Sequence, residues 1–118
     1  KPNYAESYNN MGNAFQDKEN LGEAIEAFNK AISIEPNYPE AYYNKGNAFR
    51  KKDELGNAIE AYCKAISIKP DFSDALFNMG TVLEKAIFNR QSQKGSTRRG
   101  ANRKVCRSRW TYTNPQRR

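Results

Sequence analysis

The sequence predicts an all-α solenoid of stacked helix-turn-helix units. Residues 3–36 and 37–70 align with each other at a constant offset. Within each unit, apolar side chains recur at spacings of three and four, which places them on one face of an α-helix. A period of this length is typical of helical repeats, in which each pair of helices buries its apolar face against its neighbours. We therefore expect an α-α superhelix of five helices, followed by an irregular or disordered basic tail.

The first unit is predicted to contain helices over residues 5–18 and about 21–34. Tyr8, Met11, Gly12 and Phe15 share one face of the first helix. A glycine inside a helix costs about 1 kcal/mol relative to alanine. Glycine nevertheless recurs at the same position of successive units, as Gly12, Gly46 and Gly80. This recurrence indicates that a second helix approaches these positions too closely for a Cβ atom.

Prolines mark the limits of the units. Pro36 and Pro70 end the second helices, because proline lacks a backbone N–H and biases its predecessor away from the helical conformation. Pro39 suits the first turn of the next helix. The predicted repeat array covers residues 1–88, with units at 5–38, 39–72 and a truncated third at 73–88; residues 89–118 form the tail.

The third unit is predicted to begin at Ser73, since Ser73 and Asp74 can cap a helix. No second helix follows it in the sequence. The residues expected to lose their covering surface are Met79, Leu83, Ile87 and Phe88. Because an array normally ends in a helix with a polar outer face, we expect self-association through the uncapped third unit, loose packing or truncation.

These positions resemble the tetratricopeptide repeat (TPR), whose pattern is an aromatic residue, Leu-Gly, an aromatic residue, Ala, an aromatic residue, Ala and Pro. The matching positions are Tyr8, Met11, Gly12, Phe15, Ala24, Phe28, Ala31 and Pro36, then Tyr42, Lys45, Gly46, Phe49, Ala58, Tyr62, Ala65 and Pro70. Only Lys45 departs, at the Leu position. The resemblance implies a protein-interaction scaffold that binds an extended peptide or partner protein in the concave groove of the first helices.

Asparagines recur on these first helices. Asn10, Asn44 and Asn78 occupy equivalent positions of the three units, and Asn13, Asn47 and Thr81 form a second row on the same face. An amide side chain can donate to and accept from a peptide backbone whatever the peptide's side chains are. Similar asparagine ladders occur in TPR domains that hold extended chains. The alternative is that asparagine is a tolerated consensus residue here.

A specialised TPR groove holds a C-terminal carboxylate with Lys, Arg and two Asn. By resemblance, Asn13 and Asn44 match the amides, whereas Asn9, Asp74 and Asn78 replace the cations. A C-terminal carboxylate is therefore a poor ligand. An acidic peptide stays possible because positive charge lies near the groove edge at Arg50, Lys51 and Lys85.

The basic charge belongs to the tail. Residues 1–88 contain ten basic and 13 acidic residues, whereas residues 89–118 contain ten basic and no acidic residues. Basic side chains among aromatics can bind phosphates and stack on bases. The alternative function is thus a nucleic-acid or anionic-surface tether, and a solvated tail or a translated frame-slip product are further alternatives. The candidate residues are Arg98, Arg99, Arg103, Lys104, Arg107 and Trp110.

The sequence offers no catalytic or metal-binding motif, so we expect a protein without enzymatic activity or cofactor. It contains no histidine, the commonest general base and metal ligand. Cys63 and Cys106 match no metal-ligand spacing, which indicates a reducing, cytoplasmic environment. No apolar run approaches the roughly 20 residues of a membrane span, and no signal peptide is evident. Residues 1–4 resemble the end of a repeat, so the chain is either a fragment of a longer array or keeps a stub.

Overall fold

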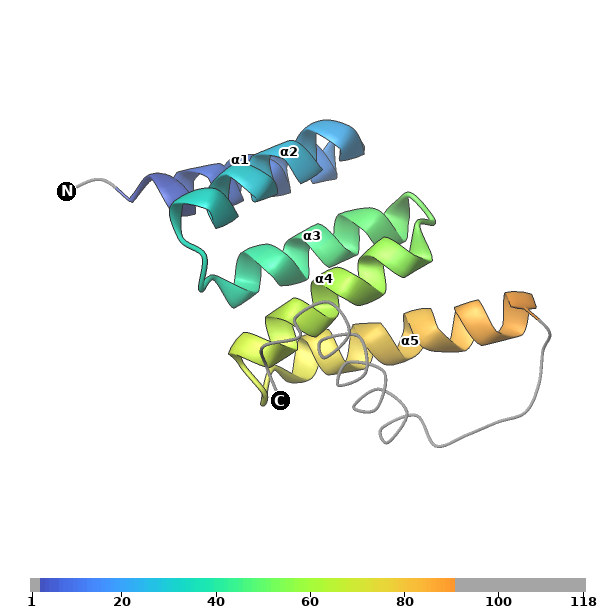
Figure 1. The fold of residues 1–118 in the computed structure, drawn as a ribbon. Coiled ribbons are helices and arrows are strands. Elements are labelled where there is room, and N and C mark those ends of the chain that lie inside the picture. The colour runs from blue at the N-terminus through green and yellow to red at the C-terminus, as the bar shows by residue number, and fades with distance from the viewer. Residues whose placement is uncertain (1–2, 91–118) are drawn as a thin grey trace.

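The computed structural model describes residues 3–90, which form five α-helices and no β-strand (Figure 1). The helices are α1 (Tyr4–Asp17), α2 (Leu21–Ile34), α3 (Pro39–Lys51), α4 (Leu55–Ile68) and α5 (Ser73–Arg90). The predicted all-α fold is confirmed. Helix α5 continues through residues 89 and 90, the first two of the predicted tail, and residues 91–118 lie outside the described residues.

The helices stack in helix-turn-helix units. α1 pairs with α2 and α3 pairs with α4, while each second helix also packs against the first helix of the following unit, α2 on α3 and α4 on α5. The first helices meet along the stack as well, α1 with α3 and α3 with α5. Because every unit contacts its neighbours in the same way, the described region is a helical solenoid.

The helix limits follow from local chemistry. α1 begins one residue earlier than predicted because the side chain of Asn3 caps it, its Oδ1 accepting from the Glu6 amide at 3.1 Å. α3 begins with Pro39 in its first turn, as expected. α2 and α4 both end two residues before a proline, Pro36 and Pro70.

The recurrent glycines lie where the two helices of a unit meet most closely. A Cβ atom on Gly12 would stand 2.5 Å from Cε1 of Phe28, and one on Gly46 would stand 2.7 Å from Cε1 of Tyr62. Both rings are fully buried. The predicted reason for these glycines is confirmed at both positions.

The turns inside the first two units repeat one backbone conformation. Glu19 and Asp53 occupy equivalent positions of the two units, and both adopt the left-handed region, with φ of 64° and 65°. In the first turn, the Asn20 amide donates to the Phe15 carbonyl at 2.8 Å, which closes the end of α1. Figure 1 shows both turns on the same edge of the solenoid, one above the other in successive units.

The first helices α3 and α5 each bury one face against the unit before them. On α3 this face includes Ala41 and Ala48, and on α5 it includes Ala75, Met79 and Val82; all five are at most 1% exposed. Met79 places its sulfur 3.8 Å from Sγ of Cys63 on α4. The prediction that Met79 would lose its cover was therefore wrong, because it packs against the preceding second helix, α4.

The equivalent face of α1 is open. Its members are Ser7, Asn10, Met11 and Ala14, all exposed. Met11 occupies the same repeat position as Met79 but is 45% exposed. No second helix precedes α1 among residues 3–90, so nothing in the described structure covers this face.

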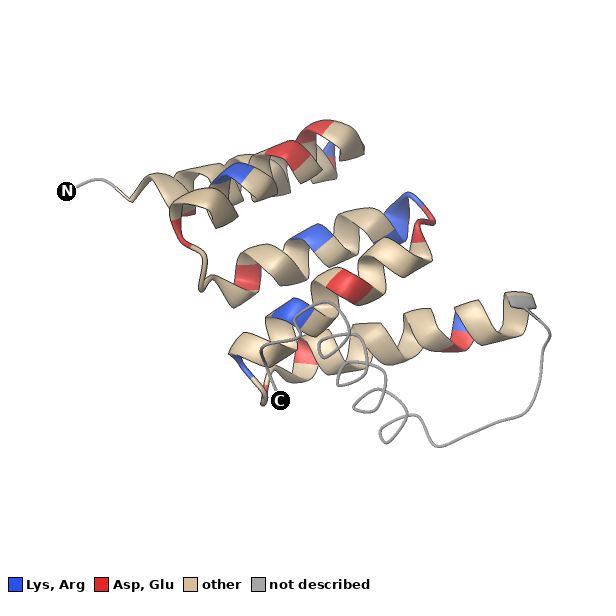
Figure 2. Ribbon diagram, in the orientation of Figure 1, with Lys and Arg blue, Asp and Glu red and all other residues tan. Residues whose placement is uncertain are grey.

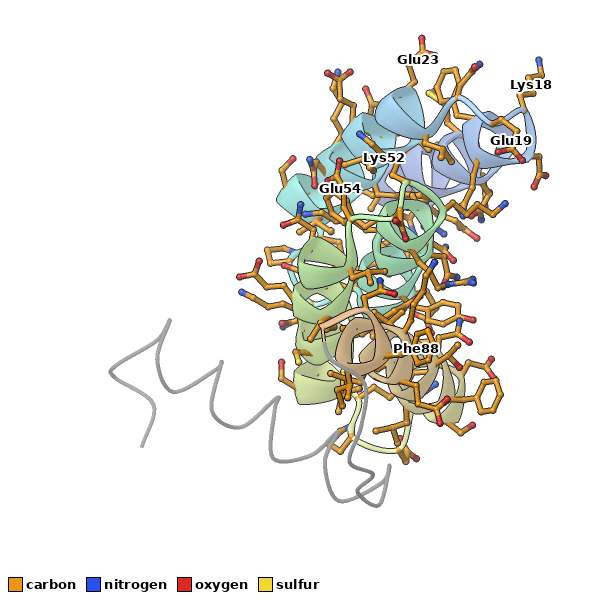
Figure 3. All side chains as sticks on the ribbon, turned by 90° about the vertical axis from the view of Figure 1, so that its right-hand side faces the viewer. Lys18, Glu19, Glu23, Lys52, Glu54 and Phe88 are labelled. Atoms are coloured by element: carbon orange, nitrogen blue, oxygen red, sulfur yellow. The ribbon has the colours of Figure 1, made fainter. Side chains whose placement is uncertain are left out.

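The other end of the stack exposes large apolar side chains on α5. Phe77 is 70% exposed, Ile87 43% and Phe88 74% (Figure 3). The expected exposure of Ile87 and Phe88 is confirmed, and Leu83 is half-buried. Large apolar side chains are therefore exposed at the α5 end, whereas both signs of charge are interspersed along α3, α4 and α5 (Figure 2).

Candidate peptide-binding face

Asparagines on the first helices connect successive units. The side chain of Asn44 on α3 donates from Nδ2 to Oδ1 of Asn9 on α1, at 3.0 Å. Asn78 on α5 donates from Nδ2 to the hydroxyl of Tyr43 on α3, at 3.1 Å. The two bonds link equivalent positions of neighbouring units. We call them the inter-unit amide bridges.

A second set of hydrogen bonds converges on Asn47. Its Oδ1 accepts from Nδ2 of Asn78 at 3.0 Å and from the hydroxyl of Tyr62 at 2.5 Å. Since these three residues lie on α3, α5 and α4, one carbonyl oxygen ties together the three helices at the junction of units two and three. This polar junction gives Asn47 a structural role that its helical spacing alone does not indicate.

Asn9 and Tyr43 accept the inter-unit amide bridges; Tyr43 was not identified from the sequence, and Asn9 was considered only as a replacement for a cation. Asn9 is only 7% exposed, and Tyr43 packs its ring 5.1 Å from that of Phe72 and 6.0 Å from that of Tyr62, centroid to centroid. The available signal was their place directly before the repeat positions of Asn10 and Asn44. Each donor asparagine bonds to the residue 35 positions earlier in the sequence, Asn44 to Asn9 and Asn78 to Tyr43.

Burial affects the pKa of two tyrosine hydroxyls on or near the first helices, Tyr62 at the Asn47 junction and Tyr38 beside Asn9. Burial raises the pKa of the Tyr62 hydroxyl, and the nearby Arg50 guanidinium opposes part of that rise. Burial also raises the pKa of Tyr38, where a hydrogen bond with Asn9 works in the opposite direction. Both hydroxyls therefore stay protonated at neutral pH and can donate.

The remaining predicted residues differ in exposure. Asn10 is exposed and Asn13 is half-buried, while Thr81 is exposed and its hydroxyl donates to the Phe77 carbonyl of its own helix at 3.2 Å. Arg50 is half-buried in the last turn of α3. We call Asn10, Asn13, Asn44, Asn47, Arg50, Asn78 and Thr81 together the first-helix face.

The first-helix face retains hydrogen-bonding capacity. An amide side chain offers two N–H donors and one carbonyl oxygen with two lone pairs. Among the described residues, Oδ1 of Asn44 and of Asn78 and Nδ2 of Asn47 form no hydrogen bond. Acceptors and donors therefore alternate along the stacked first helices.

The tail candidates, Arg98, Arg99, Arg103, Lys104, Arg107 and Trp110, lie outside the described residues. Within residues 3–90, no group of three or more Cys, Asp or Glu side chains is arranged to hold a metal ion. Across the same residues, no helix has the length and apolar character that crossing a membrane requires.

The fold and the repeated junctions define a class of protein, the helical-repeat scaffolds that interact with other proteins. The sequence profile of the TPR repeat matches residues 12–53 and 46–86. The chain belongs to the tetratricopeptide repeat family. A search of curated proteins found no match.

Two solved structures of MamA resemble the chain. One superposes with a TM-score of 0.73 at 29% sequence identity, covering 94% of this chain and 61% of the MamA chain. The other gives a TM-score of 0.71 at 29% identity, covering 95% of this chain and 58% of the MamA chain. The chain thus spans about three fifths of the MamA chains that it matches.

Proposed function

We propose that the first-helix face binds an extended polypeptide of a partner protein. The supporting observation is the alternation of unused acceptors on Asn44 and Asn78 with the unused donor on Asn47. An extended peptide presents its own carbonyl and amide groups to both sides. Amide side chains recognise this backbone without selecting particular side chains, so apolar contacts with the stack would act together with these hydrogen bonds.

The inter-unit amide bridges support this proposal for a second reason. They hold Asn44 and Asn78 in fixed orientations, which lowers the entropy lost when a ligand binds. Asn44 keeps one N–H and its oxygen for a ligand after donating to Asn9. Recognition would therefore use side chains that the fold has already positioned.

The test begins with random linear peptides displayed on phage and selected on the full chain, followed by calorimetric titration of a selected peptide. Asn10→Ala combined with Asn44→Ala should weaken binding by about tenfold or more. Asn29→Ala is the matched control, because Asn29 is an exposed asparagine on α2. Equal affinities for the double variant and the control, with both proteins folded by circular dichroism, would rule out the first-helix face as the site.

The alternative of a nucleic-acid or anionic-surface tether stays a prediction, carried by the ten basic residues and absence of acidic residues in 89–118. Binding of single-stranded RNA should then fall steeply with salt concentration and disappear when these residues are deleted. RNA affinity that survives the deletion would eliminate this alternative.

A further inference from the structure

A buried nitrogen atom on the first-helix face lacks a hydrogen-bond partner. Nε of Arg50 is shielded from solvent and donates to no acceptor in the described structure. A buried N–H group that forms no hydrogen bond destabilises the folded state, and native proteins seldom retain one without a functional reason. The position of Arg50 within the polar junction suggests what that reason is.

The Arg50 guanidinium donates a hydrogen bond to the Tyr62 hydroxyl, but Nε of Arg50 itself has no acceptor among the described residues. The nearby Tyr62 hydroxyl donates to Oδ1 of Asn47, and this oxygen also accepts from Asn78. Asn47 lies three residues before Arg50, so the two side chains share one face of α3. Nδ2 of Asn47 also forms no hydrogen bond among the described residues. Two donors, Nε of Arg50 and Nδ2 of Asn47, are therefore unused here, whereas the nearby acceptor Oδ1 of Asn47 already accepts two hydrogen bonds.

The acidic residues nearest in sequence are engaged elsewhere. Asp53 forms an ion pair with Lys85 at 3.0 Å, and Glu54 forms one with Lys52 at 3.3 Å. Arg50 takes part in no ion pair among the described residues, and its helix neighbour Lys51 is exposed. The end of α3 therefore has excess positive charge as well as excess donors.

We propose that Arg50 and Asn47 form a receptor for a side-chain carboxylate of the bound polypeptide, so that the partner segment is acidic. This inference rests on the proposed function of the first-helix face. Arg50 is half-buried, so a ligand reaches the buried Nε only if the side chain rotates away from Tyr62. A carboxylate then accepts from the planar guanidinium through two parallel N–H bonds. Nδ2 of Asn47 supplies a further donor.

The arrangement differs from a site for a chain-terminal carboxylate. Asp74 is exposed on α5, at a position where such a site carries a cation, and its charge repels an anion. Binding of aspartate or glutamate side chains is the source that we favour. A C-terminal carboxylate supplies the same chemistry and is separated from it by the choice of peptide.

The test uses three synthetic peptides with the full chain. The first is a serine-glycine peptide with interspersed glutamates and blocked ends, the second replaces each glutamate with glutamine, and the third is the glutamine peptide with a free C-terminal carboxylate. The Nε–Hε signal of Arg50 is followed by 15N NMR, and affinities are obtained from the same titrations. We expect the glutamate peptide to shift this signal and to bind about tenfold more tightly than the glutamine peptide.

Variants assign that preference to Arg50. Arg50→Met should abolish the preference for glutamate, whereas Lys51→Met, which removes the same charge one residue away, should change it by less than about twofold, as expected of a screened surface charge. Thermal unfolding of both variants shows whether they are folded. If Lys51→Met and Arg50→Met reduce the preference equally, or if the Arg50 signal does not move, the receptor is overturned.

The remaining outcomes separate this inference from the proposed function. Binding of the glutamate peptide that depends on Asn44 but not on Arg50 overturns the receptor and leaves the first-helix face in place. A preference for the free C-terminal carboxylate overturns the assignment to side-chain carboxylates. If none of the three peptides binds, the receptor is overturned. The proposed function is then tested separately, by the titration of phage-selected peptides described above.

Discussion

Gly12 on α1 lies directly against the buried ring of Phe28 on α2. A Cβ atom at residue 12 would stand between 2.5 and 2.8 Å from three carbon atoms of that ring. Phe28 has no exposed surface, so the ring cannot move aside without disturbing the core. Glycine therefore occupies residue 12 despite its low helix propensity, because the close contact between α1 and α2 leaves no room for a Cβ atom.

Gly12→Ala should lower the free energy of unfolding by about 1–3 kcal/mol, because overpacking exceeds the gain in helix propensity of about 1 kcal/mol. Urea denaturation measures this change. Gly22→Ala on α2 is the control, since no atom lies within 4 Å of its added Cβ atom, and it should stabilise by about 0.5 kcal/mol. Destabilisation by both alanines would contradict the steric explanation.

Lys45→Met should raise the free energy of unfolding by about 1 kcal/mol. Lys45 is half-buried, and burial lowers the pKa of its ammonium group below the ordinary value of 10.5. Methionine occupies the equivalent positions 11 and 79. The substitution therefore removes a desolvated charge and supplies the residue that the repeat uses elsewhere.

The advantage of Lys45→Met should depend on pH. The unfolded chain holds the Lys45 proton more tightly than the folded chain, so the penalty is fully present below the lowered pKa. It disappears as pH rises from that pKa towards 10.5. Urea denaturation at several pH values, with the exposed Lys51→Met as reference, should show the difference shrinking in alkali. A constant difference would mean that packing alone stabilises the variant.

Glu19→Gly should stabilise the fold by about 0.5–1 kcal/mol. Glu19 has φ of 64°, a conformation that costs about 1 kcal/mol for a residue with a Cβ atom and little for glycine. Glu23→Gly removes the same charge from the first turn of α2 and should destabilise by about 1 kcal/mol. Thermal unfolding distinguishes the two substitutions, and a destabilising Glu19→Gly would show that the side chain contributes more than the backbone strain.

The exposed ends of the stack should cause concentration-dependent self-association. Phe77 and Phe88 on α5 are 70% and 74% exposed, and burying one such side chain contributes about 1.5–3 kcal/mol. Phe77→Gln combined with Phe88→Gln should reduce association measured by sedimentation equilibrium. Ile34→Gln, at a site 48% exposed on α2, should leave it unchanged. A wild-type chain that stays monomeric at all concentrations would disprove this prediction.

The repeat period and the prolines were sufficient to predict the helices, because both depend on local sequence. Helical spacing also placed Met11 and Met79 on apolar faces, yet one is 45% exposed and the other fully buried. The difference depends on which helix precedes each of them. Periodicity describes a single helix and contains no information about that neighbour.

The asparagine rows illustrate the same distinction for the candidate site. Their spacing predicted a shared face, but not that Asn44 would donate to Asn9 or that Asn47 would accept from Tyr62. Those partners are set by how one unit rotates on the next, a tertiary quantity. The unpartnered nitrogen of Arg50 likewise emerges only when three helices are brought together.

The inter-unit amide bridges keep asparagine as the donor but change the acceptor, from an amide at Asn9 to a phenol at Tyr43. A phenol oxygen lies further from its backbone than an amide oxygen, so each acceptor favours its own tilt between neighbouring helices. A long array built from such units would vary its curvature along its length. A flexible ligand would then contact a concave surface whose curvature differs from one repeat to the next.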